Sequence, residues 1–113
     1  MHELAITEGI INAAVPEAEK HGASRILEIR LKIGELSGVL PGYIQECFDI
    51  VSQGTIAQGA RLVIERIPVT IRCLDCGFEG VIDRKKIRCP QCGGAELKLI
   101  GGREYFVDSL EVE

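Results

Sequence analysis

The stretch that decides the fold is Cys73-Leu-Asp-Cys76, followed after twelve residues by Cys89-Pro-Gln-Cys92. The two residues within each pair let both thiolates face inward on one tight turn. Two such turns facing each other place four sulfurs at the corners of a tetrahedron, which is the geometry of a closed structural Zn(II) site. Glycines follow both pairs and allow backbone N–H groups to turn toward the sulfurs. The spacing therefore predicts a small zinc ribbon.

The residues between the pairs, 77–88, read as two short strands around a turn at residues 83–86. Two disulfides are one alternative use of the same cysteines. No secretory signal pattern opens the chain, and disulfides are rare in the cytosol, so this alternative is disfavoured. Iron in a rubredoxin-like centre stays chemically open, because a tetrahedral set of four sulfurs suits either metal. In each metal case no coordination position is free for a substrate.

The chain has 113 residues, enough for one domain with a small appendage. Hydrophobic residues make up 46% and aromatic residues only 4%, so aliphatic side chains must fill the core. No apolar run reaches the length of a membrane span. With 17 acids against 13 bases the net charge is −4, which argues against a nucleic-acid binder. The local basic cluster Arg84, Lys85, Lys86 and Arg88 favours the alternative, a zinc-ribbon module that binds nucleic acid or a transcription complex.

Two segments show the spacing of amphipathic helices. Most of residues 1–22 has helical periodicity, but Pro16 predicts a kink, or a break and restart. A second helix is expected to begin at Pro41 and to stop before Gly54. Its apolar stripe includes Cys47, which we interpret as a small buried hydrophobe. The apolar positions are Leu4, Ile10, Ile11, Ala14 and Ala18 in the first helix, and Ile44, Cys47, Phe48 and Val51 in the second.

The remaining segments predict strands. Residues 23–33 alternate between aliphatic and charged side chains, as in a strand with one buried face. Further strands are expected over residues 61–67, 95–100 and 103–113, and in the last of these Phe106, Leu110 and Val112 share a face. The predicted class is α+β, with two helices on a small three-stranded mixed sheet and an inserted zinc-ribbon subdomain. The main domain would comprise residues 1–68 and 98–113, and the ribbon residues 69–97, where bound zinc must supply much of the stability.

The first residues, Met1-His2-Glu3, offer a second metal site. The α-amine of Met1, the backbone nitrogen that follows it and the imidazole of His2 can close chelate rings on one ion. Such a planar, nitrogen-rich set suits Ni(II) or Cu(II), and Glu3 adds a carboxylate. We expect Met1 to be retained because His2 is bulky. The alternative is that these are ordinary residues of a frayed terminus.

Several motifs occur in one order and spacing: Met1-His2-Glu3-Leu4, the Leu-Lys-Ile-Gly-Glu-Leu stretch of residues 31–36, Cys47-Phe48 with Gly54-Thr55, and the two cysteine pairs. In this combination the chain resembles the HypA/HybF family of nickel-incorporation proteins for hydrogenase maturation. The resemblance covers essentially the whole chain.

The resemblance implies a cytoplasmic nickel metallochaperone, not an enzyme. His2 would be the principal ligand of transferable Ni(II), with the Met1 amine and Glu3 as further candidates. Structural Zn(II) would bind Cys73, Cys76, Cys89 and Cys92. The implied partners are a HypB-type GTPase and the large subunit of a [NiFe] hydrogenase, while a homodimer is left open. Some relatives add an acidic nickel ligand before the second helix, but position 40 is Leu here, so Glu35 or a water would have to substitute.

Overall fold

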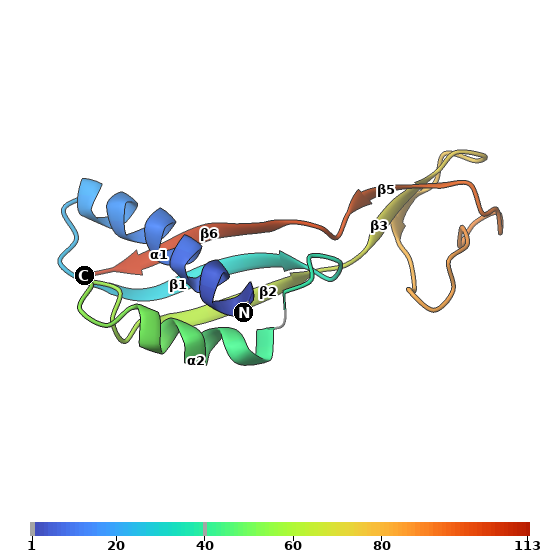
Figure 1. Cartoon of the computed structure of the whole chain (residues 1–113). Helices are drawn as coiled ribbons and strands as arrows, with labels where there is room; N and C mark the ends of the chain where they lie inside the picture. The colour runs from blue at the N-terminus through green and yellow to red at the C-terminus, as the bar shows by residue number, and fades with distance from the viewer. Residues whose placement is uncertain (1, 40) are drawn as a thin grey trace. The chain divides into compact units, whose positions relative to one another are not determined.

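The structure of the protein is a computed structural model that describes residues 2–39 and 41–113, without the side chain of His2 (Figure 1). The chain forms two compact units. Unit 1 consists of Met1–Lys32, Val39–Glu65 and Phe106–Glu113, and unit 2 of Ile33–Gly38 and Arg66–Tyr105. Each unit is therefore built from segments that are distant in the sequence.

A three-stranded sheet with two helices forms the framework of unit 1. In chain order the elements are α1 (His2–Lys20), β1 (Ile26–Gly34), α2 (Pro41–Val51), β2 (Arg61–Ile67) and β6 (Tyr105–Val112). The strand order is β2-β1-β6. The arrows of β1 and β2 point the same way in Figure 1 and that of β6 points the opposite way, so the sheet is mixed. This arrangement confirms the predicted α+β class.

The core of unit 1 is aliphatic, as the composition predicts. On α1, four of the five predicted apolar positions are buried, but Leu4 is 45% exposed. Thr7 takes the core-facing position one turn later and is fully buried. Its hydroxyl donates to the Leu4 carbonyl at 2.9 Å, so the helix itself satisfies the buried oxygen. On α2, Ile44 and Phe48 are buried and Cys47 is half-buried.

The predicted break at Pro16 is wrong, because α1 runs unbroken from His2 to Lys20. Proline removes one backbone N–H and leaves the carbonyl of the residue four positions earlier without its helical donor. Pro16 and Asn12 are both exposed, so water can reach that carbonyl. The helix therefore continues through the proline, which rules out the break and restart.

The strands also differ from the prediction at their ends. β1 begins at Ile26, three residues later than expected, because Ser24 and Arg25 form hydrogen bonds with Glu113 instead. The Ser24 N–H and hydroxyl both donate to the Glu113 carbonyl, at 2.9 and 3.0 Å, and the Glu113 N–H donates to the Arg25 carbonyl. The bounds of β2, Arg61–Ile67, are those that the sequence predicts.

Unit 2 contains a second sheet, made of β3 (Thr70–Cys73), β4 (Glu79–Val81) and β5 (Leu97–Gly101) in the antiparallel order β4-β3-β5. The turn at 83–86 forms, since the Lys86 N–H donates to the Asp83 carbonyl at 2.9 Å. The predicted hairpin around that turn is wrong, because β4 pairs with β3 and no strand follows the turn. The buried core of this unit is small. It comprises Val69, Ile71 and Ile82, with Phe78, Leu97 and Leu99 packed against it.

Both ends of the segment that carries the second sheet meet the backbone of residues 34–36. The Glu35 N–H donates to the Ile67 carbonyl at 2.9 Å, where the segment begins. The N–H groups of Gly34 and Leu36 donate to the carbonyls of Glu104 and Gly102, at 2.6 and 2.7 Å, where it ends. We call this set of three hydrogen bonds the backbone clasp. A Cβ atom on Gly34 would overlap the Gly102 carbonyl, so the clasp requires glycine at position 34.

Replacing Gly34 by alanine is expected to break the clasp, because neither colliding group is a flexible side chain that could move away. We expect a loss of stability of about 3 kcal/mol or more, in the upper range for single substitutions. Urea unfolding of Gly34→Ala measures it. Gly9→Ala is the matched control, since a Cβ at Gly9 meets nothing within 4 Å. Alanine in this helical position should stabilise the protein by up to about 1 kcal/mol. Equal stabilities of the two variants would contradict the close approach.

Candidate metal centre

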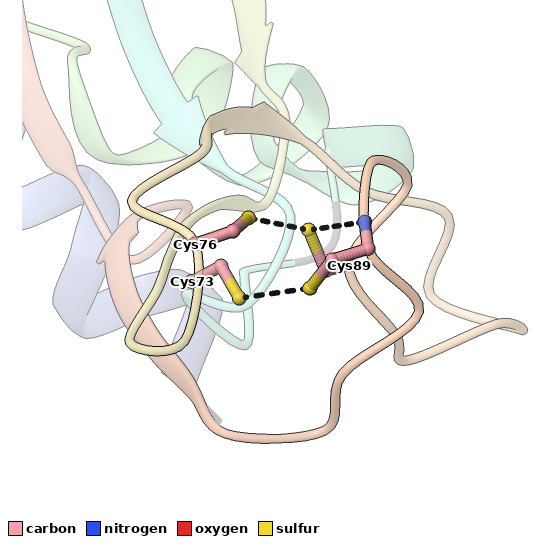
Figure 2. Close-up of side chains that lie close together, drawn as sticks. Cys73, Cys76 and Cys89 are labelled. Atoms are coloured by element: carbon pink, nitrogen blue, oxygen red, sulfur yellow. Dashed lines mark hydrogen bonds between the residues drawn. The ribbon is translucent and has the colours of Figure 1, made fainter.

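Four cysteine sulfurs converge in unit 2. The Sγ atoms of Cys73, Cys76, Cys89 and Cys92 all lie within 4.8 Å of one another. Two of the separations, Cys73 to Cys92 and Cys76 to Cys89, are 3.6 Å. Sulfurs about 2.3 Å from a tetrahedral zinc ion are about 3.8 Å apart, so the arrangement fits a closed four-sulfur site. Figure 2 shows Cys73 and Cys76 on one side of the gap and Cys89 on the other.

The backbone around each pair repeats one hydrogen-bond pattern. The Gly77 N–H donates to the Cys73 carbonyl and the Gly93 N–H to the Cys89 carbonyl, both at 2.9 Å. Gly77 and Gly93 have φ values of 80° and 74°, a left-handed conformation that favours glycine. At a third glycine, Gly94, a Cβ would lie 2.7 Å from a carboxylate oxygen of Asp75 and 3.3 Å from Cys92 Sγ, so a side chain there would displace Asp75. These glycines explain how two short loops fold tightly around the sulfurs.

Backbone N–H groups also point at the second pair of sulfurs. Those of Gln91 and Cys92 lie 3.4 Å from Cys89 Sγ, and that of Gly94 lies 3.4 Å from Cys92 Sγ. Burial by itself would raise the pKa of the Cys89 thiol, but the Cys92 and Gln91 N–H groups and neighbouring thiols outweigh it and lower that pKa to about 7. The thiolate, which is the form that binds metal, is therefore favoured at Cys89.

No disulfide joins these residues in the structure. A disulfide requires two sulfurs about 2.05 Å apart, and all five cysteines are free thiols in the structure. Cys47, the fifth, lies on α2 outside the four-sulfur group. In the part of the chain that the structure describes, no other group of three or more histidine, cysteine, aspartate or glutamate side chains could hold an ion.

The proposed ligands at the N-terminus fall largely outside the described residues. This applies to Met1 and to the side chain of His2, although α1 begins at His2. Glu3 lies in the first turn of α1 and is half-buried. Leu40 is also outside the described residues. Glu35, named above as a substitute ligand, belongs to unit 2, where its carboxylate lies 4.0 Å from the Arg84 guanidinium.

The basic cluster at the 83–86 turn has acidic neighbours, since Asp83 precedes it and the Arg84 guanidinium lies 4.0 Å from the Glu35 carboxylate. Arg84, Lys85, Lys86 and Arg88 are all exposed. However, unit 2 as a whole contains six acidic residues as well as eight basic ones. Binding to phosphates requires a face from which acids are largely absent, so the charge distribution does not favour a nucleic-acid site. Among the described residues, neither helix is both long and apolar enough to cross a bilayer.

Comparison with known proteins identifies relatives of the whole chain. Residues 1–112 match the profile of a family described as hydrogenase/urease nickel incorporation, metallochaperone, hypA. Hydrogenase maturation factor HypA of Dehalococcoides mccartyi is 42% identical over 113 residues, which cover all of this chain and 95% of that protein. Hydrogenase maturation factor HypA 2 of Bradyrhizobium diazoefficiens is also 42% identical, and both chains are covered completely.

Two solved structures share the fold. The solution structure of the Ni metallochaperone HypA from Helicobacter pylori has a TM-score of 0.67 and 21% sequence identity, over 97% of this chain and 96% of that one. A second, described as the solution structure of HypA protein, has a TM-score of 0.74 and 23% identity, over 100% of this chain and 97% of the other. At these identities the likeness concerns the fold alone.

Removing one sulfur is expected to unfold unit 2, because its buried core is too small to persist without the metal. Cys89→Ser should bind less than one equivalent of zinc and lose the dispersed NMR signals of β3, β4 and β5. A strong chelator should have the same effect on the native protein. Cys47→Ser is the matched control and should keep both the metal and the signals. A folded, metal-free Cys89→Ser protein would contradict a structural role for the site.

Proposed function

Because the chain belongs to the HypA family of nickel metallochaperones for hydrogenase maturation, we propose that it binds Ni(II) at its N-terminus and delivers it to the large subunit of a [NiFe] hydrogenase. The observation that carries the proposal is the family match from residue 1 to residue 112, which includes the Met1-His2-Glu3 motif. His2 is the principal ligand of the nickel cargo. The Met1 amine and the Glu3 carboxylate complete or support the site.

The chemistry of the two metal sites supports a division of roles. A donor must hold nickel against loss and still release it to a better site. Amine and imidazole nitrogens of adjacent residues provide few ligands, and each can leave separately, so the ion can exchange. The four cysteine sulfurs would instead fill all four coordination positions of a tetrahedral ion. We therefore assign resident Zn(II) to Cys73, Cys76, Cys89 and Cys92. Binding of this ion supplies folding energy to unit 2.

The domain assignment follows the same division. The nickel-binding domain comprises residues 1–68 and 98–113, and the zinc-ribbon domain comprises residues 69–97. By their contacts, residues 33–38, 66–68 and 98–105 group with the ribbon. The zinc keeps the ribbon folded as a surface on which partners can dock.

The proposed setting is the cytoplasm, where a HypB-type GTPase acts with this protein. The chain has no Gly-rich phosphate-binding loop, so nucleotide hydrolysis belongs to the partner. The chain itself acts as a carrier, and its chemical step is the exchange of ligands on nickel.

The nickel site can be tested by titrating untagged protein with Ni²⁺ in a calorimeter. His2→Ala, and a protein with a short N-terminal extension, should each bind at least about 100-fold more weakly. Removing a group that only supports a metal ligand typically lowers metal affinity by about 10- to 100-fold, so removing the ligand itself should cost at least as much. His21→Ala is the matched control, because His21 is exposed near the other end of α1 and lies 3.2 Å from Glu17. Unchanged tight binding in both test proteins would eliminate the N-terminal site.

Delivery can be tested separately, with nickel-free large subunit and a limiting amount of nickel. The native protein loaded with nickel, together with the GTPase and GTP, should fill the large subunit in the presence of a competing chelator. His2→Ala should transfer no nickel under the same conditions, whereas His21→Ala should transfer as much as the native protein. Metal analysis of the reisolated subunit measures the transfer. Equal filling from free Ni²⁺ and from the loaded protein would contradict a delivery role.

A further inference from the structure

Unit 1 contains a groove of about 490 Å³ between α1 and β6. On the helix side its wall is formed mainly by small side chains, which keep the helix surface low beside the strand. On the strand side the wall is partly apolar. The residues that define these walls are Ala13, Ala14 and Ala18 on α1, and Leu110 and Val112 on β6.

The strand beside this groove is an edge strand. In the part of the chain that the structure describes, β6 pairs with β1 on one side and has no strand on the other. It is eight residues long and contains neither proline nor lysine, two residues that often protect sheet edges. Phe106 and Val112 on this strand are 45% and 41% exposed. The open edge can therefore accept another strand.

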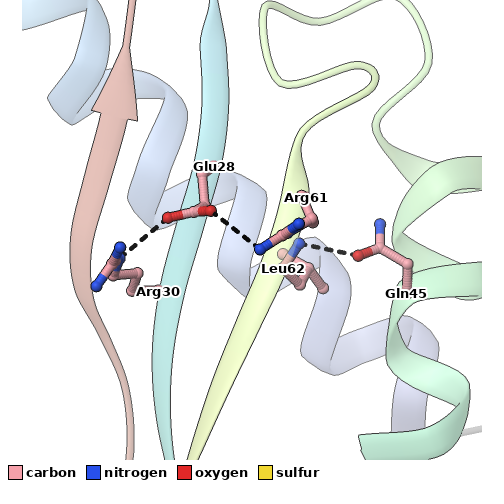
Figure 3. A network of polar contacts seen from close by, with 5 residues as sticks. All are labelled: Glu28, Arg30, Gln45, Arg61 and Leu62. Atoms are coloured by element: carbon pink, nitrogen blue, oxygen red, sulfur yellow. Dashed lines mark hydrogen bonds and ion pairs between the residues drawn. The ribbon is translucent and has the colours of Figure 1, made fainter.

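The charged groups on the sheet face away from α1 are largely paired with one another. Figure 3 views this face, with α1 behind the sheet, and shows Glu28 between Arg30 and Arg61. The Glu28 carboxylate lies 3.0 Å from the Arg30 guanidinium and 3.7 Å from that of Arg61. Lys32 lies 4.0 Å from Glu65 and 3.9 Å from Asp108. This face thus neutralises its own charges, which leaves the edge and the groove as the open features.

The charge around the groove is negative. Unit 1 carries eleven acidic residues and only five basic ones. Glu17 lines the groove, and Glu111 lies on β6 between the lining residues Leu110 and Val112. Asp108 also lines the groove, but its carboxylate is paired with Lys32 at 3.9 Å. Glu17 has an exposed histidine, His21, as its neighbour at 3.2 Å. No lysine or arginine lines the groove among the described residues. A ligand of matching charge is therefore basic.

We propose that an extended basic segment of a partner protein adds to β6 as a fourth strand of the sheet. Its backbone would pair with the open edge, and its aliphatic side chains would lie in the groove against the alanines of α1. Its lysines or arginines would contact Glu17 and Glu111. This mode of recognition takes affinity from main-chain hydrogen bonds and specificity from alternate side chains. It does not depend on the nickel site.

The same charges argue against a second copy of this chain as the occupant. Pairing of β6 with β6 around a two-fold axis would bring the acidic residues of one copy beside those of the other. Like charges on neighbouring strands are destabilising. A basic strand from another protein meets no such repulsion.

The test uses a short capped peptide that alternates lysine with valine, added to the full-length protein. We expect NMR shift changes and slower amide exchange along β6, centred on Val107 and Ser109. Ala13→Trp fills the groove and should weaken binding about tenfold or more, equivalent to at least about 1.4 kcal/mol. Ala5→Trp is the matched control, because Ala5 is equally exposed on α1 but lies outside the groove. Glu17→Lys should also weaken binding, whereas Glu19→Lys, at an exposed position outside the groove, should not.

A second peptide of similar composition, interrupted by prolines, cannot pair as a strand and should not bind. Equal binding of both peptides, equal binding to Ala13→Trp and Ala5→Trp, or no binding of the alternating peptide would each overturn the proposal. Sedimentation of the native protein completes the test. A dimer that Ala13→Trp dissociates would assign the groove to a second copy and would also overturn it. Nickel affinity should be unchanged in Ala13→Trp, which separates this result from the nickel titration.

Discussion

The backbone clasp at residues 34–36 is the constraint on which the rest of the structure depends. The segment with the four cysteines departs after β2 and returns before β6, and both of its ends bond to the same short stretch of backbone. This closure holds the two ends of a long insertion together through backbone hydrogen bonds that involve no metal ligand, which reduces the entropy cost of forming the second sheet. The clasp exists because Gly34 has no side chain where the Gly102 carbonyl approaches. All residues of the clasp belong to unit 2, so it closes the base of that unit.

Sequence patterns predicted the local elements well where burial alone decides them. The bounds predicted for β2 are correct, and helical spacing located α1 and α2. Alternation of aliphatic and charged residues located β1, although the predicted start was three residues too early. The errors arise where distant segments decide the outcome. The hairpin expected around residues 83–86 does not form, because β4 pairs with β3, the strand that ends at Cys73. The predicted break at Pro16 fails for a different reason, since solvent can satisfy the carbonyl that proline leaves free.

The candidate metal centre was accessible from the sequence because cysteine pairs at short spacing constrain one another locally. The glycines after each pair predicted N–H groups turned toward the sulfurs, and three such groups lie beside the sulfurs of the second pair. Nothing in the sequence, however, indicated that Asp75 would approach Gly94. The acidic groove between α1 and β6 was equally invisible, because it depends on which strand lies at the sheet edge. Strand order depends on contacts between segments that are distant in the chain, and local sequence patterns do not specify those contacts.

The four sulfurs of the metal centre differ in their access to solvent. Cys73 and Cys89, the first residue of each pair, are 1% and 3% exposed, whereas Cys76 and Cys92 lie at the surface. Oxidants, alkylating reagents and competing thiols can therefore reach only the sulfurs of Cys76 and Cys92. Damage to the centre therefore begins at the two outward ligands, and loss of either sulfur leaves fewer than the four ligands that a closed site requires.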